Sequence, residues 1–413
     1  MKPYSLIGAI AVCAFAIACQ PALDINGDPR SSRYVKTRYM GEGPEDNPSQ
    51  REDPAPKLDT TVYFSAVEFP KGYDWKKDSA CGNSNATLRL YRNFEPYADF
   101  TTGESTCIST DPDTHHWIDG NLYTEYNLYG TTVISKNGRE LFRYEGQEFL
   151  KGLLILGEDV WTLGQNCKGK GFSLRCNGEA ALTDTQGIIF GDLTSSAHEG
   201  LYVDSGKICF CYQREAVNSS NLCTVSDSEV LFYTSRTQKV HDMVISNGEV
   251  SIIHSSGGVT IYERGQDTIQ IGGKTLELDN AWLFGRTSYP LVFLALKEGE
   301  KQEYMVLDRN VAVSIGDGWQ VYMYPKGDSS FRYVKFSGFE MFLGDMEKGV
   351  LTSYSRPGVF GRSCLKFLGD DYFLACNGSD GTVSIETKQK SVPVEVNGYV
   401  SALDVRLEKA QEE

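Results

Sequence analysis

The sequence has little that would support catalysis or repeated passage through a membrane. No apolar run after residues 6–18 approaches the about 20 residues that a helix needs to cross a bilayer. There are 5 histidines in 413 residues, and the motifs Gly-x-Ser-x-Gly, Gly-x-x-x-x-Gly-Lys and His-Glu-x-x-His are absent. The chain therefore lacks the common signatures of a serine hydrolase, a nucleotide-binding loop and a zinc protease, and no cofactor or metal is expected.

Basic residues are also in deficit. The chain has 55 Asp and Glu against 40 Lys and Arg, which gives a formal net charge of -15. Nucleic acids and anionic lipid surfaces attract basic proteins, because both carry negative charge. The composition therefore argues against both as partners.

The N-terminus has the pattern of an exported chain. Lys2 precedes an uncharged apolar run of about a dozen residues, which suits a signal peptide and is too short to span a bilayer. The run ends in Ala16-Ile-Ala-Cys19, which resembles a bacterial lipobox. The resemblance implies a signal peptide over residues 1–18 and acylation of Cys19, whose two or three acyl chains would anchor the protein permanently in a lipid bilayer. Gln20 in place of Asp implies the outer membrane, and leaves open whether the protein faces the periplasm or the cell surface.

Two further regions follow the signal peptide. Residues 19–60 hold six of the 14 prolines and almost no apolar periodicity, which is typical of a flexible tether. From Thr61 onward, short runs of β-forming residues alternate with Gly, Asn and Pro, which predicts a β domain over residues 61–413. An apolar stripe with helical spacing occurs only near the end, from Ser401 to Gln411.

The β region is repetitive. A strand, a tight polar turn and a second strand recur seven times, at intervals of 37 to 50 residues that average about 42. The turns centre near Asn137, Asn177, Asp227, Arg264, Arg309, Glu347 and Lys388.

This spacing predicts the fold. A unit of about 42 residues with three or four strands has the size of one propeller blade, so we expect an all-β propeller of seven blades, with six or eight as alternatives. A pair of β-sandwiches or a β-helix is less favoured, because β-helix coils are much shorter and sandwiches seldom repeat a hairpin at one spacing. A strand from the N-terminal part, either Thr61–Val67 or Ala86–Tyr91, would complete a blade and close the ring.

A propeller behind a lipobox and a proline-rich tether resembles the β-propeller lipoproteins of Bacteroidetes. The resemblance rests on spacing and turn residues. It implies the architecture and the membrane location and assigns no active-site residue.

Cysteine is the next informative residue. Nine cysteines remain besides Cys13 and Cys19, and in an oxidising compartment they can form disulfides. We expect Cys167 to pair with Cys176 and Cys364 with Cys376, because each pair flanks a short turn. Cys209 or Cys211 with Cys223, and Cys81 with Cys107, are further possibilities, whereas the spacing fits a zinc site poorly.

Two acidic segments contain residue types that could support chemistry. Asp111, Asp113, His115 and His116 form the one segment with metal-ligand residues, although adjacent histidines on a strand point in opposite directions. Asp370-Asp371 contributes carboxylates of the kind that a glycosidase uses.

Aromatic residues are the stronger indication of function. They make up 12% of the chain, and Tyr and Trp on loops suit contacts with glycans or protein partners. The candidate contacts are Tyr123, Tyr126, Trp282 and Trp319, with Tyr129 and Trp161 considered beside them, although Trp161 has the surroundings of a core residue. We expect a lipid-anchored binding or scaffold module for a protein or glycan. The alternative is a carbohydrate-active lyase or hydrolase with acidic residues in a central funnel.

Overall fold

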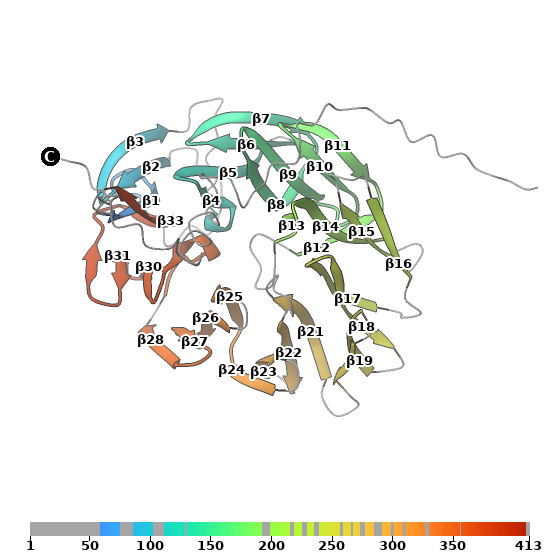
Figure 1. Ribbon diagram of the computed structural model, residues 1–413. Coiled ribbons are helices and arrows are strands. Elements are labelled where there is room, and N and C mark those ends of the chain that lie inside the picture. Colours follow the sequence, from blue (N-terminus) through green and yellow to red (C-terminus); the bar gives the residue numbers. More distant parts are fainter. Residues whose placement is uncertain are drawn as a thin grey trace, which may run out of the picture. The chain divides into compact units, whose positions relative to one another are not determined.

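The chain folds into a ring of eight antiparallel sheets (Figure 1). The computed structural model describes residues 58–74, 86–101, 111–128, 130–191, 199–214, 219–224, 229–234, 239–256, 259–265, 267–272, 277–284, 291–298, 301–308, 311–326, 330–355 and 357–409. All of them belong to one compact unit. The predicted β-propeller is confirmed, with eight blades rather than seven.

The first four blades follow one another along the chain. Blade 1 contains β4 (His115–Ile118), β5 (Asn121–Leu128), β6 (Thr131–Lys136) and β7 (Arg139–Glu145), and blade 2 contains β8 (Glu148–Leu156), β9 (Asp159–Asn166), β10 (Phe172–Cys176) and β11 (Glu179–Asp184). Blade 3 contains β12 (Gly187–Phe190), β13 (Tyr202–Asp204), β14 (Lys207–Arg214), β15 (Ser219–Thr224) and β16 (Glu229–Thr234), and both β12 and β13 pair with β14. Blade 4 contains β17 (Lys239–Ser246), β18 (Glu249–Ser256), β19 (Val259–Arg264) and β20 (Asp267–Gly272).

The other four blades complete the ring. Blade 5 contains β21 (Glu277–Phe284), β22 (Leu291–Glu298), β23 (Lys301–Asp308) and β24 (Val311–Asp317), and blade 6 contains β25 (Gln320–Lys326), β26 (Ser330–Ser337), β27 (Glu340–Asp345) and β28 (Gly349–Ser355). Blade 7 contains β29 (Leu365–Leu368), β30 (Asp371–Asn377), β31 (Val383–Thr387) and β32 (Ser391–Pro393). Blade 8 joins β33 (Gly398–Lys409) to β1 (Leu58–Glu68), β2 (Thr87–Arg92) and β3 (Glu95–Thr101).

The predicted turns are all at equivalent positions. Each of the seven lies between the third and fourth strands of blades 1 to 7, although Asp227 and Arg309 themselves lie outside the described residues. Asn137 and Gly138 show why the Asn-Gly pair suits such a turn, since both have a positive φ, of 49° and 74°. The repeat in the sequence is therefore the outer hairpin of each blade.

The eighth blade was missed because its turn has different residues. Asn93 lies 44 residues before Asn137 and forms the corresponding hairpin turn between β2 and β3. The second position of this turn is Phe94, which has a φ of 69° where a glycine is usual. Residues 58–101 therefore supply three strands of a regular blade.

Strands from the two ends of the chain close the ring. β33 pairs with β1 in antiparallel register from Leu58 with Lys409 to Glu68 with Gly398, which confirms closure by an N-terminal strand. β1 begins at Leu58, three residues before the predicted boundary at Thr61. The helical interpretation of Ser401–Gln411 is wrong for the described residues 401–409, which form part of β33, pair with β1 and bury Leu403.

Side chains link blade 3 to blade 4 and blade 4 to blade 5 at the spacing of the repeat. The Tyr202 hydroxyl accepts a hydrogen bond from the Ile245 amide at 2.9 Å, 43 residues away. Asp242 accepts one from the Leu283 amide at 2.7 Å, 41 residues away. Both acceptor side chains are buried, and each receives its hydrogen bond from a backbone amide of the next blade. These bonds satisfy the buried oxygen atoms and fix the position of one blade relative to the next.

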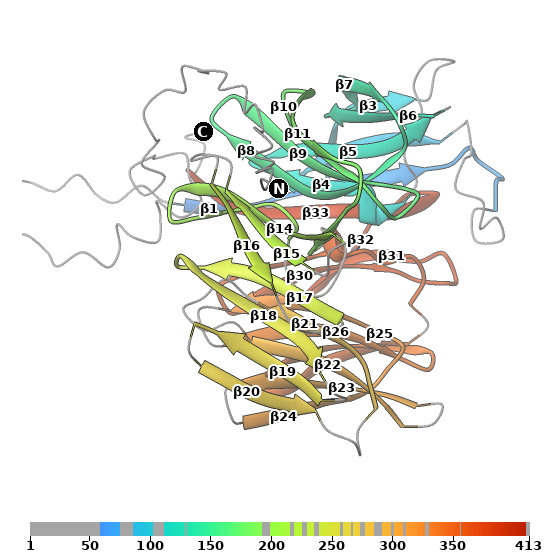
Figure 2. The same cartoon turned by 90° about the vertical axis from the view of Figure 1, so that its right-hand side faces the viewer.

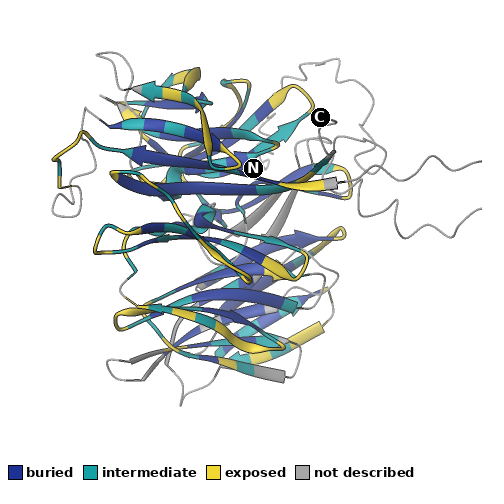
Figure 3. Ribbon diagram, turned by 90° about the vertical axis from the view of Figure 1, so that its left-hand side faces the viewer, coloured by how far each residue is buried: buried dark blue, intermediate teal, exposed yellow. Residues whose placement is uncertain are grey.

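In blades 1, 2, 6 and 7, burial decreases from the middle of the sheet to its outer strand (Figure 3). The blades lie face to face around the ring, as the side view shows (Figure 2), and their apolar side chains interlock between sheets. Outer strands such as β7 and β28 are largely exposed. The two helices among the described residues are the 3-10 turns Pro112–Thr114 and Arg362–Cys364, and neither is long and apolar enough to cross a membrane.

The predicted disulfide between Cys167 and Cys176 does not form. Cys167 begins the turn after β9, whereas Cys176 lies opposite Trp161, six residues back along that strand. Six residues of strand span about 20 Å, and a disulfide requires Cα atoms within about 7 Å. The turn of the β9–β10 hairpin is therefore not centred between the two cysteines, so they do not lie opposite each other across it.

The predicted disulfide between Cys364 and Cys376 is also wrong. Leu365 pairs with Leu374, so the two cysteines lie near each other along the blade but on different faces of its sheet. Cys364 packs against β33, and its thiol lies 3.5 Å from the Ser401 carbonyl, whereas Cys376 faces blade 6. Of the other cysteines, Cys223 lies opposite Phe210 rather than Cys209 or Cys211, while Cys19, Cys81 and Cys107 lie outside the described residues.

Candidate functional site

Two cavities open at one end of the ring. In each blade, the turn between the second and third strands and the connection to the next blade leave at this end, which we call the cavity face. A cavity of about 200 Å³ lies between blades 6 and 7, and we call it the inter-blade cavity. A second, more open cavity of about 320 Å³ lies between blades 7 and 8, and is lined by Gly72, Tyr73, Asp74, Asp380, Gly381, Val396 and Asn397.

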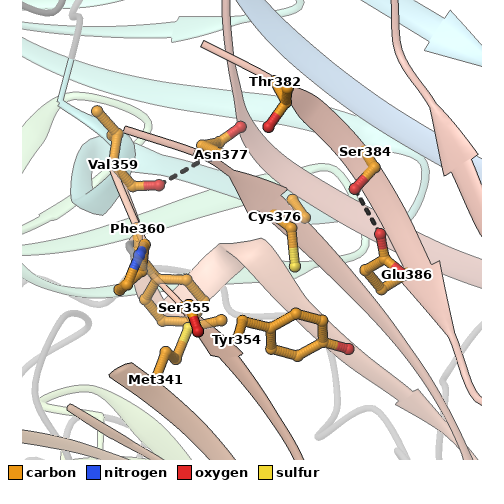
Figure 4. A pocket seen from close by; sticks show the side chains of 13 residues that line it. Met341, Tyr354, Ser355, Val359, Phe360, Cys376, Asn377, Thr382, Ser384 and Glu386 are labelled. Atoms are coloured by element: carbon orange, nitrogen blue, oxygen red, sulfur yellow. Dashed lines mark hydrogen bonds between the residues drawn. The ribbon is translucent and has the colours of Figure 1, made fainter. Parts of the chain in front are cut away.

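The two walls of the inter-blade cavity differ in chemistry (Figure 4). On blade 6, Met341 and Tyr354 are register partners and present a thioether and a phenol ring. On blade 7, Cys376 and Ser384 are register partners, and Glu386 follows two residues later on the same face of β31. One wall is therefore largely apolar and the other is polar.

The segment between the two blades forms a further side of the cavity. Pro357 forms a β-bridge with Gly378, and the Asn377 side chain donates hydrogen bonds to the Val359 carbonyl at 2.8 Å and the Val400 carbonyl at 2.9 Å. The side-chain oxygen of Asn377, Oδ1, accepts a hydrogen bond from the Val400 backbone amide at 2.9 Å. Because both ends of its amide are occupied, Asn377 holds the cavity in shape and has little capacity left for a ligand.

Glu386 is the charged group of this cavity. Its Oε1 accepts hydrogen bonds from the hydroxyls of Ser384 and Ser391, both at 2.5 Å. Among the residues that the structure describes, no cation pairs with Glu386, and none of the lining residues is Lys, Arg or His. The cavity therefore has a negative electrostatic character and an oriented carboxylate.

The other ionisable groups of the cavity are neutral. Burial, reinforced by the nearby Glu386 carboxylate, raises the pKa of the Cys376 thiol above its usual range. Burial and a hydrogen bond with Tyr372 raise the pKa of Tyr354. A thiol with a raised pKa is a weak nucleophile, so Cys376 is not activated for nucleophilic attack.

The structure separates the four predicted contact aromatics. Tyr123 is buried between blades 1 and 2, so it is wrong as a ligand contact. Tyr126 is half-buried on β5, and Trp282 is half-buried and stacked on Phe293 at 5.3 Å between ring centroids. Trp319 alone of the four is strongly exposed, at 60%.

Trp319 lies on the cavity face and is linked to the inter-blade cavity through one intervening aromatic ring. Its amide donates a hydrogen bond to the Phe336 carbonyl at 2.9 Å, and the two rings lie 5.1 Å apart. Phe336 in turn lies 5.4 Å from Phe360, which lines the cavity. Phe339, in the turn between β26 and β27 on the same face, is 85% exposed and was missed because one aromatic in a turn carries no pattern.

Two other predicted positions have structural roles. Trp161 packs partly buried between blades 2 and 3, which confirms its assignment as a core residue, and Tyr129 lies outside the described residues. Asp370, one of the two carboxylates of the Asp370-Asp371 segment, forms an ion pair with Arg332 at 3.1 Å. Its carboxylate therefore has a structural partner.

The histidine segment does not assemble a metal site. The ring of His115 is buried with Nδ1 2.7 Å from the Ser401 hydroxyl, and Asp111 caps the 3-10 turn by accepting from the Asp113 amide. Burial lowers the pKa of His116 to about 3, with a contribution from His115, so its imidazole is neutral at pH 7. Within the described part of the chain, no group of three or more His, Cys, Asp or Glu residues is arranged to hold a metal ion.

Comparisons with known proteins assign the chain to no family. No protein family model matches the chain, and no curated protein matches it. Among solved structures, it is similar to dihydro-heme d1 dehydrogenase NirN in complex with DHE, at 14% identity and a TM-score of 0.47, over 83% of this chain and 74% of that one. It is also similar to Hsv2p of Kluyveromyces lactis, at 8% identity and a TM-score of 0.40 over 70% and 99% of the two chains, and to a chain of a nidogen/laminin complex, at 8% and 0.34 over 63% and 98%.

Proposed function

We propose that the protein is a lipid-anchored binding module of the outer membrane, and that its cavity face receives a protein or glycan ligand. The observation that carries the proposal is the position of Trp319 and Phe339. They are the two most exposed large apolar side chains among the described residues, and both lie on blade 6 at the cavity face. Tryptophan dominates many binding surfaces because it brings a large rigid area at small entropic cost.

Replacing both aromatics tests the binding role. The double variant Trp319→Ala, Phe339→Ser should bind its ligand at least about 30-fold more weakly, which is the effect expected from losing a central aromatic anchor. Because both side chains are exposed, the free energy of unfolding should change by no more than about 0.5 kcal/mol. Binding would be measured on a panel of purified glycans and on solubilised envelope proteins of the source bacterium.

A matched control uses another exposed aromatic. Tyr97 on β3 is 50% exposed and lies on the outer strand of blade 8. Tyr97→Ser should leave binding unchanged, since this residue is not on the cavity face. If the double variant binds as tightly as the original protein, or if Tyr97→Ser weakens binding equally, the cavity face is not the binding surface.

The anchoring part of the proposal rests on residues 16–19 of the sequence. Cys19→Ala should abolish fatty-acid labelling and shift the protein from the membrane fraction to the soluble fraction, because the acylated residue is removed. Metabolic labelling with palmitate followed by fractionation measures both. Cys13→Ala is the control, since this residue lies within the proposed signal peptide. Continued labelling of the Cys19→Ala protein would refute lipidation at this position.

A further inference from the structure

We propose that the inter-blade cavity is a carbohydrate subsite that takes one neutral sugar ring, with Trp319 as the platform for the adjoining ring. This inference rests on the proposed binding function and names the ligand class of the same face.

The size of the cavity suits one small ring. Pockets for drug-sized ligands have volumes of roughly 300–1,000 Å³, and this cavity has about 200 Å³. Ser355 and Thr382 line it and are exposed, so it communicates with solvent at the cavity face. A ligand that enters is therefore the terminal ring of a longer chain that continues across the face.

The opposed walls match the two surfaces of a sugar. A pyranose ring carries C–H groups on its faces and hydroxyls on its edge. Tyr354 and Met341 on blade 6 and Phe360 in the connecting segment offer apolar contact to the ring face. Ser384 and Glu386 on blade 7 lie across the cavity and offer hydrogen-bonding groups to the hydroxyl edge.

Glu386 supplies orientation and charge selectivity. Ser384 and Ser391 both donate to Oε1, so they hold the carboxylate in place while Oε2 has no hydrogen-bond partner among the described residues. A carboxylate oxygen accepts strong, charge-assisted hydrogen bonds from hydroxyl groups. No basic side chain lines the cavity, so sulfated or carboxylated sugars would meet an unbalanced negative charge.

Trp319 extends the site beyond one ring. It is linked to the cavity wall through Phe336 and Phe360 and remains largely exposed to solvent. An aromatic face in this position gives a second sugar a flat apolar surface. We therefore expect disaccharides to bind more tightly than monosaccharides, and Trp319→Ala to remove that difference.

Cys376 reports occupation of the cavity directly. Its thiol lines the cavity, whereas Cys167 lies in the turn after β9 on blade 2. Neutral and acidic mono- and disaccharides that include the common terminal hexoses would be added to the full-length chain, and the alkylation rate of each cysteine followed by mass spectrometry. Because burial raises the pKa of both thiols, the reaction would be run at alkaline pH with a large excess of alkylating agent and followed over hours. A bound neutral sugar should slow alkylation of Cys376 in proportion to the occupied fraction and leave Cys167 unchanged.

Two variants test the named contacts. Glu386→Gln keeps the shape and removes the charge, and should weaken sugar binding by about tenfold or more, as expected for loss of a hydrogen bond to a charged group. Ser384→Leu should fill the cavity and abolish binding. Glu179→Gln, at an exposed position on β11, is the matched control and should bind normally. Thermal unfolding of each variant shows whether it is folded.

The outcomes separate this inference from the proposed function. Protection of Cys376 by neutral sugars, lost in Glu386→Gln, supports the subsite. If only acidic sugars or primary amines protect Cys376, or if no sugar does while envelope proteins still bind through Trp319 and Phe339, the carbohydrate subsite is wrong and the binding module stands. If neither sugars nor envelope proteins bind, both proposals fail.

Discussion

Deleting residues 58–101 should cause the chain to aggregate. These residues form the three outer strands of blade 8, and without them the edge of β33 is left unpaired along the whole of its pairing with β1. Exposed strand edges pair with other chains. Apolar side chains that pack on this blade, among them Trp117 of blade 1, would also lose their cover. Size-exclusion chromatography with light scattering and thermal unfolding measure the effect.

Two controls isolate ring closure from mere shortening of the chain. Deleting residues 20–57, which end just before β1, should leave the unfolding midpoint unchanged. A circular permutant that begins at Asp111 and joins Lys409 to Leu58 through a short turn should fold and remain monomeric, because these two residues face each other in the β33–β1 register. A monomeric deletion variant with the original unfolding midpoint would show that blade 8 is not needed for closure.

Replacing Arg175 by leucine should destabilise the ring by about 3–5 kcal/mol, the usual effect of leaving a buried charge unpaired. Arg175 on β10 donates to both carboxylate oxygens of Glu148, at 2.6 and 2.9 Å, and both side chains are only 8% exposed. The guanidinium also lies 3.8 Å from the centre of the Tyr144 ring on blade 1. Gly164 leaves room for the pair, since a Cβ there would lie 2.1 Å from Glu148 Oε2.

Two further variants check the cause by denaturant unfolding. The double variant Glu148→Met, Arg175→Leu removes both charges and should recover most of the lost stability. Arg143 and Glu140 form an ion pair of the same chemistry at 2.6 Å, but their side chains are 40% and 37% exposed. Arg143→Leu should therefore change the free energy of unfolding by less than about 1 kcal/mol. Equal losses in Arg143→Leu and Arg175→Leu would contradict the role assigned to burial.

The repeat and the ring were predictable because backbone geometry selects turn residues. Asn137-Gly138 and Asn177-Gly178 adopt positive φ, so the sequence marks these two hairpins directly, and the spacing locates the others. The eighth repeat was not visible, because its turn, Asn93-Phe94, lacks the glycine that follows Asn137 and Asn177. The disulfides were mispredicted because a short separation does not say on which face of a sheet, or how far along it, each cysteine lies.

The candidate site was only partly predictable. Trp319 was among the expected contacts, but composition does not distinguish it from Tyr123, which packs in the core. The inter-blade cavity is formed by residues of five segments between Met341 and Glu386, none of them unusual in its local sequence. Only the packing of blade 6 against blade 7 brings Tyr354 and Glu386 to opposite walls.

The pairing of β33 with β1 also sets the order in which the ring folds. Tyr63 donates to Glu408 across 345 residues of chain, whereas the hairpins within blades 1 to 7 join strands that are neighbours in sequence. The loss of chain entropy makes closing so long a loop roughly 3 kcal/mol less favourable in free energy than closing a loop of about a dozen residues. The seven local blades should therefore form first and blade 8 last. Because β33 is the last of the described strands to be synthesised, the chain keeps β1 without its inner partner until residues 398–409 have emerged.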